Sequence, residues 1–156
     1  MAVGSCGSIS INMETISVNF NLDSSNYAAT LGFSVVYNSN IIVDINHVDS
    51  KRNIVFDLTL DDGDHDLQFI IKNKNENHTQ VDDNNNIVTD SCLTITDMQI
   101  NDIDLDINFY DNCSYHHDFN GTQDPIEDSF HGIMGCNGTV TFKFAMPFYI
   151  WLLENF

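Results

Sequence analysis

Carboxylate side chains gather in the stretch HDLQFIIKNKNENHTQVDDNNNIVTDSCLTITDMQIND, residues 65–102, where Asp82, Asp83 and Asp90 bracket a turn of three asparagines. Calcium binds about six to eight oxygen atoms from carboxylates, amides, backbone carbonyls and water, and this segment offers all of the protein groups among them. The pattern predicts a calcium site at Asp82, Asp83 and Asp90. The alternative is a set of solvated turns, which are also rich in Asp and Asn.

Two further acidic groups flank this stretch. They are Asp61, Asp62, Asp64 and Asp66 in the preceding turn, and Asp102, Asp104 and Asp106 after it. Alternate residues of a strand share one face, so the second group predicts three carboxylates that repel one another unless the face is solvated or holds a cation. The Gly and Glu that an EF-hand places at its sixth and twelfth positions are absent, which excludes an EF-hand.

The overall charge limits the partners. The chain has 23 Asp and Glu against 5 Lys and Arg, a formal net charge of −18. Such a surface repels phosphate, which argues against nucleic-acid binding and against anionic membranes. Self-repulsion costs stability unless bound cations or salty surroundings offset it.

Catalytic motifs are missing from the sequence. It contains no G-x-S-x-G, no phosphate-binding loop and no H-E-x-x-H. His116 and His117 are adjacent, so in a strand they would point to opposite faces and could not easily share one metal ion. We therefore expect a protein that is not an enzyme.

The four cysteines, Cys6, Cys92, Cys113 and Cys136, include no C-x-x-C pair, which argues against a zinc knuckle. The first residues, MAVGSCGSIS, lack the charged and apolar regions of a signal peptide. We therefore expect synthesis in a reducing cytoplasm and buried free thiols, with disulfides as the alternative.

Alternating apolar residues dominate the chain and predict short strands. The expected strands are residues 8–22, 30–37, 41–45, 53–60, 66–71, 87–88, 92–100, 103–109 and 138–146. A change of parity in the first run predicts a bulge or a bend near residues 14–15, and residues 110–128 are expected to be irregular. Together these features predict one domain over residues 1–156, an all-β, antiparallel β-sandwich of jelly-roll-like type.

The C-terminal stretch PFYIWLLENF contains six consecutive apolar or aromatic residues, from position 148 to 153. As a strand it would bury the side chains of one face in the sandwich, and the apolar side chains of the other face would need to be buried against another surface. We therefore predict that Phe148, Tyr149, Trp151 and Leu152 contribute to contact with another subunit. The alternative is a strand buried wholly in the core.

The second half of the chain resembles known proteins. The positions that carry the resemblance are His65-x-Leu67, Lys72-Asn73-Lys74, Thr79, Val81-Asp82, Ile87-Val88-x-Asp90, Ile100-x-x-Ile103, HDFNGT at residues 117–122, and GCNGTV followed by PFYIWLLEN within residues 135–155. Over roughly residues 60–156 they are similar to virion structural proteins of marine tailed bacteriophages and to the β-sandwich of calcium-dependent carbohydrate-binding modules.

The resemblance implies two functions. The first is a structural protein of a bacteriophage virion, associated with the capsid or tail, made in the host cytoplasm and contacting other virion proteins or itself. The alternative is a calcium-dependent, lectin-like carbohydrate-binding module used for adhesion, with calcium as cofactor and a glycan as ligand. The sequence shows no clear aromatic platform for stacking a sugar, which favours the first.

Overall fold

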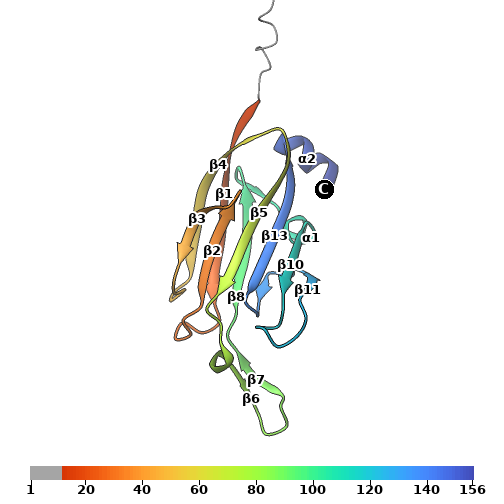
Figure 1. Cartoon of the computed structure of the whole chain (residues 1–156). Helices are drawn as coiled ribbons and strands as arrows, with labels where there is room; N and C mark the ends of the chain where they lie inside the picture. The colour runs from red at the N-terminus through yellow and green to blue at the C-terminus, as the bar shows by residue number, and fades with distance from the viewer. Residues whose placement is uncertain (1–11) are drawn as a thin grey trace, which may run out of the picture.

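The computed structural model describes residues 12–156, and it shows two antiparallel sheets packed face to face (Figure 1). The predicted antiparallel β-sandwich is therefore confirmed. One sheet has the order β12 (Ile133–Met134), β8 (Leu93–Ile100), β1 (Met13–Ser24) and β4 (Arg52–Asp61), with β9 (Ile103–Asp104) beside β8. The other has the order β11 (Ile126–Ser129), β10 (Cys113–His117), β13 (Gly138–Met146), β5 (Gly63–Lys72), β2 (Gly32–Tyr37) and β3 (Asn40–Ile45).

Strand alternation builds the core between the sheets. In β1, Ile16, Val18, Phe20 and Leu22 all point inward and are fully buried. Phe20 meets two rings of the opposite sheet edge-on, with centroid distances of 6.0 Å to Phe33 and 5.5 Å to Phe69. Edge-to-face aromatic pairs of this kind add to the hydrophobic stabilisation of a core.

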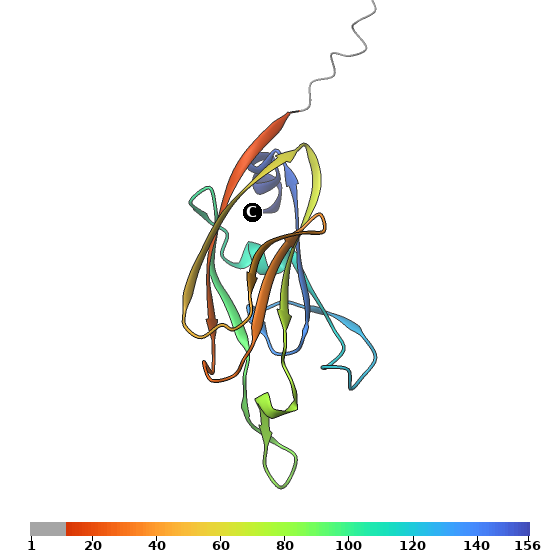
Figure 2. The same cartoon turned by 60° about the vertical axis from the view of Figure 1, so that its left-hand side comes forward.

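A hairpin stands away from the sandwich. It consists of a short 3-10 turn, η2 (Glu76–His78), and the paired strands β6 (Thr79–Val81) and β7 (Ile87–Asp90). We call residues 75–91 the arm. Figure 2 shows the arm at one end of the molecule and the C-terminal helix α2 (Phe148–Asn155) at the other.

Two expectations for the strands compare differently with the structure. The strand β13 spans residues 138–146 as predicted, but of the bulge or bend expected near residues 14–15 the pairing excludes the bulge. There, β1 pairs with β4 without interruption from Met13 to Leu22, and the irregularity of β1 lies against β8, between Asn19 and Asn21. The start of the predicted first strand, residues 8–11, lies outside the described residues.

The expected strand at residues 103–109 is also wrong, because only β9 pairs and the chain then forms α1 (Ile107–Asp111). Asp102 and Asp106 have positive φ values of 64° and 49°, which interrupt an extended strand. Asp102, Asp104 and Asp106 therefore do not share one strand face. The segment expected to be irregular, residues 110–128, instead contains β10 and the start of β11.

The C-terminal stretch forms the helix α2 rather than the expected strand. The helix packs on the end of the sandwich, where Trp151 lies edge-on to Phe142 with a centroid distance of 5.8 Å. The carboxylate Oε1 of Glu14 accepts a hydrogen bond of 3.3 Å from the backbone N–H of Phe148 at its start. A helix places residues 148 and 151 on one face, so these two can be buried while their neighbours are exposed.

Candidate functional site

A polar groove crosses one end of the larger sheet. It consists of two clefts of about 400 Å³ and 340 Å³ that share Asp64, His65 and Asp66 of β5. The first cleft is also lined by Tyr37, Asn38, Ser39 and Gln68, and the second by Asn112, Lys143, Phe144 and Trp151. Because β13, β5 and β2 are neighbours in that order, the lining runs across the strands, and we call it the transverse groove.

The groove exists because β5 is longer than its neighbour β2. The pairing of these two strands ends at Tyr37 and Leu67, and the chain then reverses through Asn38 and Ser39. Both turn residues have positive φ values, 52° and 66°, as the tight hairpin turns that match sheet twist require. The first residues of β5 therefore extend beyond β2, with Asp64 and Asp66 exposed.

His65 holds the floor of the groove in place. The side chain is buried, and its Nε2 lies 2.8 Å from the backbone oxygen of Asp61, while its Nδ1 lies 2.7 Å from the hydroxyl of Tyr37. A carbonyl oxygen can only accept, so in the neutral imidazole Nε2–H donates to Asp61 and Nδ1 accepts from the Tyr37 hydroxyl. Burial, followed by the nearby Asp61 carboxylate, raises the pKa of Tyr37, so Tyr37 stays a phenol that donates this hydrogen bond.

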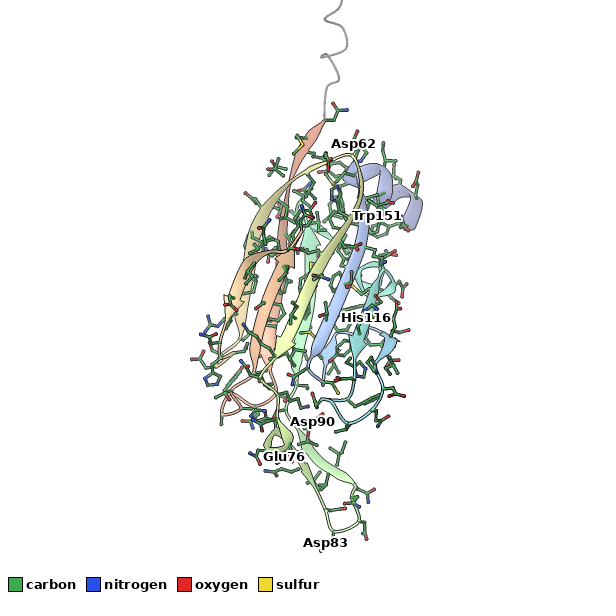
Figure 3. All side chains as sticks on the ribbon, in the orientation of Figure 1. Asp62, Glu76, Asp83, Asp90, His116 and Trp151 are labelled. Atoms are coloured by element: carbon green, nitrogen blue, oxygen red, sulfur yellow. The ribbon has the colours of Figure 1, made fainter. Side chains whose placement is uncertain are left out.

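The groove carries negative charge. Asp61, Asp62, Asp64 and Asp66 are all exposed at this end of the sheet, and the cation among the lining residues is Lys143, which lies opposite Asp66 in the β5–β13 register. Asp62 and Trp151 lie at the same end of the molecule, far from Asp83 (Figure 3). A cleft lined by one sign of charge repels ligands of that sign.

The three carboxylates predicted to bind calcium are spread along the arm. Asp82 Oδ1 accepts hydrogen bonds of 2.9 Å from the backbone N–H groups of Asn84 and Asn86, which lower the pKa of Asp82. Asp83 is at the tip of the arm and Asp90 is at its base (Figure 3). Within residues 12–156, no three His, Cys, Asp or Glu side chains lie close enough to hold one metal ion. The structure therefore does not bring the predicted ligands together.

The predicted interface residues divide into two sets. Phe148 and Trp151 are buried within the sandwich, whereas Tyr149 is 49% exposed and Leu152 is partly buried. The exposed side of α2 also carries residues that the prediction did not select: Ile150, Leu153 and Phe156. A contact with another subunit therefore stays a prediction for Tyr149 and Leu152, while Phe148 and Trp151 are occupied within the chain.

Sequence reasoning identified only part of the groove. The crowding of Asp61, Asp62, Asp64 and Asp66 was visible as a cluster, which the sequence assigned to a turn. The structure instead places Asp64 and Asp66 on one face of β5. The other lining residues come from segments as far apart as residues 37 and 151. These segments come together only through the order of the strands in the sheet, which the sequence does not show. None of the helices in the described part of the chain is long and apolar enough to cross a membrane.

The sequence matches no protein-family model and no curated protein. The fold is similar to the selenomethionine form of vCBM60, a structure described with circular permutation as an evolutionary link between two families of calcium-dependent carbohydrate-binding modules. The TM-score is 0.52 at 9% identity, and the likeness covers 81% of this chain and 89% of that one. A second structure, vCBM60 in complex with galactobiose, gives a TM-score of 0.46 at 9% identity over 81% of this chain and 96% of that one.

At this low identity, the first likeness establishes a shared β-sandwich fold and nothing finer. Neither structure is described as a virion protein, so the comparisons lend the virion hypothesis no support.

Proposed function

We propose that the protein is a non-catalytic carbohydrate-binding module and that the transverse groove binds a neutral glycan. The observation that carries the proposal is the lining of the groove, which combines exposed carboxylates and amides with the aromatic side chain of Tyr37. The β-sandwich fold, similar to that of a module described as carbohydrate-binding, supports it. Under this proposal the chain acts as one binding domain, in keeping with the core that both sheets share in the described residues.

The chemistry of the lining suits a sugar. Sugar hydroxyls are donors and acceptors, so the Asp64 and Asp66 carboxylates would accept hydrogen bonds from them, and the amides of Gln68 and Asn112 would do both. Small-molecule sites combine a few placed polar groups with apolar and aromatic walls, as this groove does. Tyr37 is held in one orientation by His65, so its ring forms a fixed wall.

The charge of the groove indicates the class of glycan. Uronates and sulfated sugars carry negative charge and would meet Asp61, Asp62, Asp64 and Asp66. A neutral sugar avoids this repulsion and still uses the carboxylates as acceptors. We therefore expect binding to neutral polysaccharides in preference to acidic ones.

Affinity electrophoresis on a panel of neutral and acidic polysaccharides would test the proposal, followed by calorimetry with oligosaccharides of any polymer that retards the protein. The double variant Asp64→Asn, Asp66→Asn should weaken binding by about tenfold or more, since each lost charged hydrogen bond is worth roughly 1.5–3 kcal/mol. Asp83→Asn is the matched control, because it removes a carboxylate at the tip of the arm.

Three results would count against the groove. The first is that no neutral polysaccharide retards the protein, and the second is that it binds acidic polysaccharides more tightly than neutral ones. The third is an equal loss of glycan affinity in the Asp64/Asp66 double variant and in Asp83→Asn. Melting temperatures of both variants near that of the natural chain would show that a loss of binding is not a loss of folding.

A further inference from the structure

A buried lysine lies at the base of the arm. The side chain of Lys74 is 1% exposed, and its Nζ lies 2.5 Å from Oδ1 of Asp90. The same ammonium group donates a hydrogen bond to the backbone oxygen of Gly135. A lysine this deeply buried is uncommon unless its charge is paired, as it is here.

The surrounding groups hold this ion pair in a fixed position. The hydroxyl of Thr79 donates to the same Asp90 Oδ1 at 2.7 Å. The backbone of Lys74 is held by the Asn137 side chain, whose Oδ1 accepts from the Lys74 N–H at 2.8 Å and whose Nδ2 donates to the Lys74 oxygen at 2.7 Å. The lysine thus joins three segments: the exit of β5, the end of β7 and the loop before β13.

The Lys74–Asp90 pair includes one of the three carboxylates that the sequence predicted to bind calcium. The residues present around Asp90 do not fit a calcium ion. Oδ1 of Asp90 already contacts the Lys74 ammonium, and Oδ1 of Asp82 accepts two hydrogen bonds within its own turn. Asp83 lies at the tip of the arm, away from Asp90 at its base. Calcium needs about six to eight oxygen ligands. A divalent ion beside the ammonium group would also be repelled by its charge.

We infer that the ammonium group of Lys74 is the cation that anchors the arm, in the place where the sequence predicted calcium. The arm stands off the sandwich and exposes Val81, Ile87 and Val88, so few apolar contacts hold it in the part of the chain that the structure describes. Its attachment rests on polar contacts at its base, where the Lys74 side chain is 1% exposed and that of its partner Asp90 is 36% exposed. This inference is independent of glycan binding in the groove.

The first test uses the unmodified full chain and calcium alone. Melting temperatures are compared in chelator, in millimolar calcium and in millimolar magnesium, at equal ionic strength. We expect calcium and magnesium to act alike, through screening only. A rise in calcium that magnesium does not reproduce would overturn the inference, because a ligand bound by the native state alone stabilises it.

The second test is a double-mutant cycle of Lys74→Met, Asp90→Asn and the double variant, with Lys51→Ala as the exposed-lysine control. Asp90→Asn should lower the melting temperature by roughly 5–10 °C, because it leaves the buried Lys74 ammonium without its charged partner. Lys74→Met should lower it by less, because the Asp90 carboxylate that it leaves is 36% exposed. The double variant should lose less than the sum of the two. Hydrogen exchange should show the loss of protection concentrated in β6 and β7 in each single variant.

Additive shifts in the cycle would overturn the inference, and so would single variants that melt like Lys51→Ala. If a single variant does not fold, the double variant decides: it should fold, since it has no unpaired charge. Failure of the double variant while Asp90→Asn folds would also contradict the proposed pairing. Loss of glycan binding is not a readout in either test, so the two proposals fail separately.

Discussion

Replacing Trp151 with alanine tests whether α2 closes the end of the sandwich. The side chain is 9% exposed and lies within 5.7 Å of Phe148, 5.8 Å of Phe142 and 6.4 Å of Phe144, measured between ring centroids. Its removal would leave a cavity bounded by three rings, and a rigid strand end cannot collapse to fill it. We therefore expect Trp151→Ala to be strongly destabilising.

The magnitude follows from the buried area. A tryptophan buries about 200 Å² of surface, which at about 25 cal/mol per Å² corresponds to about 5 kcal/mol as an upper value. Measured truncations of buried tryptophan cost roughly 3–5 kcal/mol. In a domain of this size, about 4 kcal/mol lowers the melting temperature by roughly 8–16 °C.

The assay is thermal unfolding followed by circular dichroism, with size-exclusion chromatography and light scattering on the same samples. Leu153→Ala is the matched control, since it shortens a side chain of the same helix that is 83% exposed. Its expected cost is within about 0.5 kcal/mol. Equal shifts in Trp151→Ala and Leu153→Ala would refute the packing argument. A change of oligomeric state in Leu153→Ala would assign the exposed side of α2 to a subunit contact.

Two further predictions concern titratable groups. Alkylation in denaturant without reductant should modify four cysteines, of which Cys6 lies outside the described residues. Two or fewer modified sites would indicate a disulfide. In the native protein Cys113 should react slowly, because burial raises the pKa of its thiol. Hydrogen bonds from the backbone N–H groups of Asn86 and Asn84 hold the pKa of Asp82 below its usual value of 3.8. The ionised Asp82 carboxylate therefore stabilises the arm turn fully above pH 3.8, and this stabilisation is lost as the pH falls through the lowered pKa. The protection of the Asn84 and Asn86 amides, which is their exchange rate corrected for the intrinsic dependence of exchange on pH, should fall only in acid. Asp82→Asn should remove this pH dependence, and a loss of protection already near neutral pH would contradict the assignment.

The sequence alone was sufficient for most strands and for the class of fold. Inward residues of β1, β4, β5 and β13 alternate strictly, and a period of two matches only an extended chain with one buried face. The sequence also determines the net charge. It predicts that His116 and His117, if they lie in a strand, point to opposite faces, and in β10 the first is exposed and the second buried. These properties depend on residues next to each other in the chain.

Tertiary structure decided the helix at the C-terminus and the site. The apolar run of residues 148–153 fits a strand or a helix, although its end, WLLENF, keeps a helical period. Packing on the rings of Phe142 and Phe144 at the sandwich end favours the helix, which buries Trp151. The ion-pair partner of Asp90 could likewise not be predicted from adjacent residues. Lys74 lies 16 residues away in the sequence and reaches Asp90 only when β5 and β7 come together. The transverse groove has the same origin. Its walls come from three strands, a hairpin turn, the residue before β10 and a helix, and contacts between segments distant in sequence leave no local pattern to read.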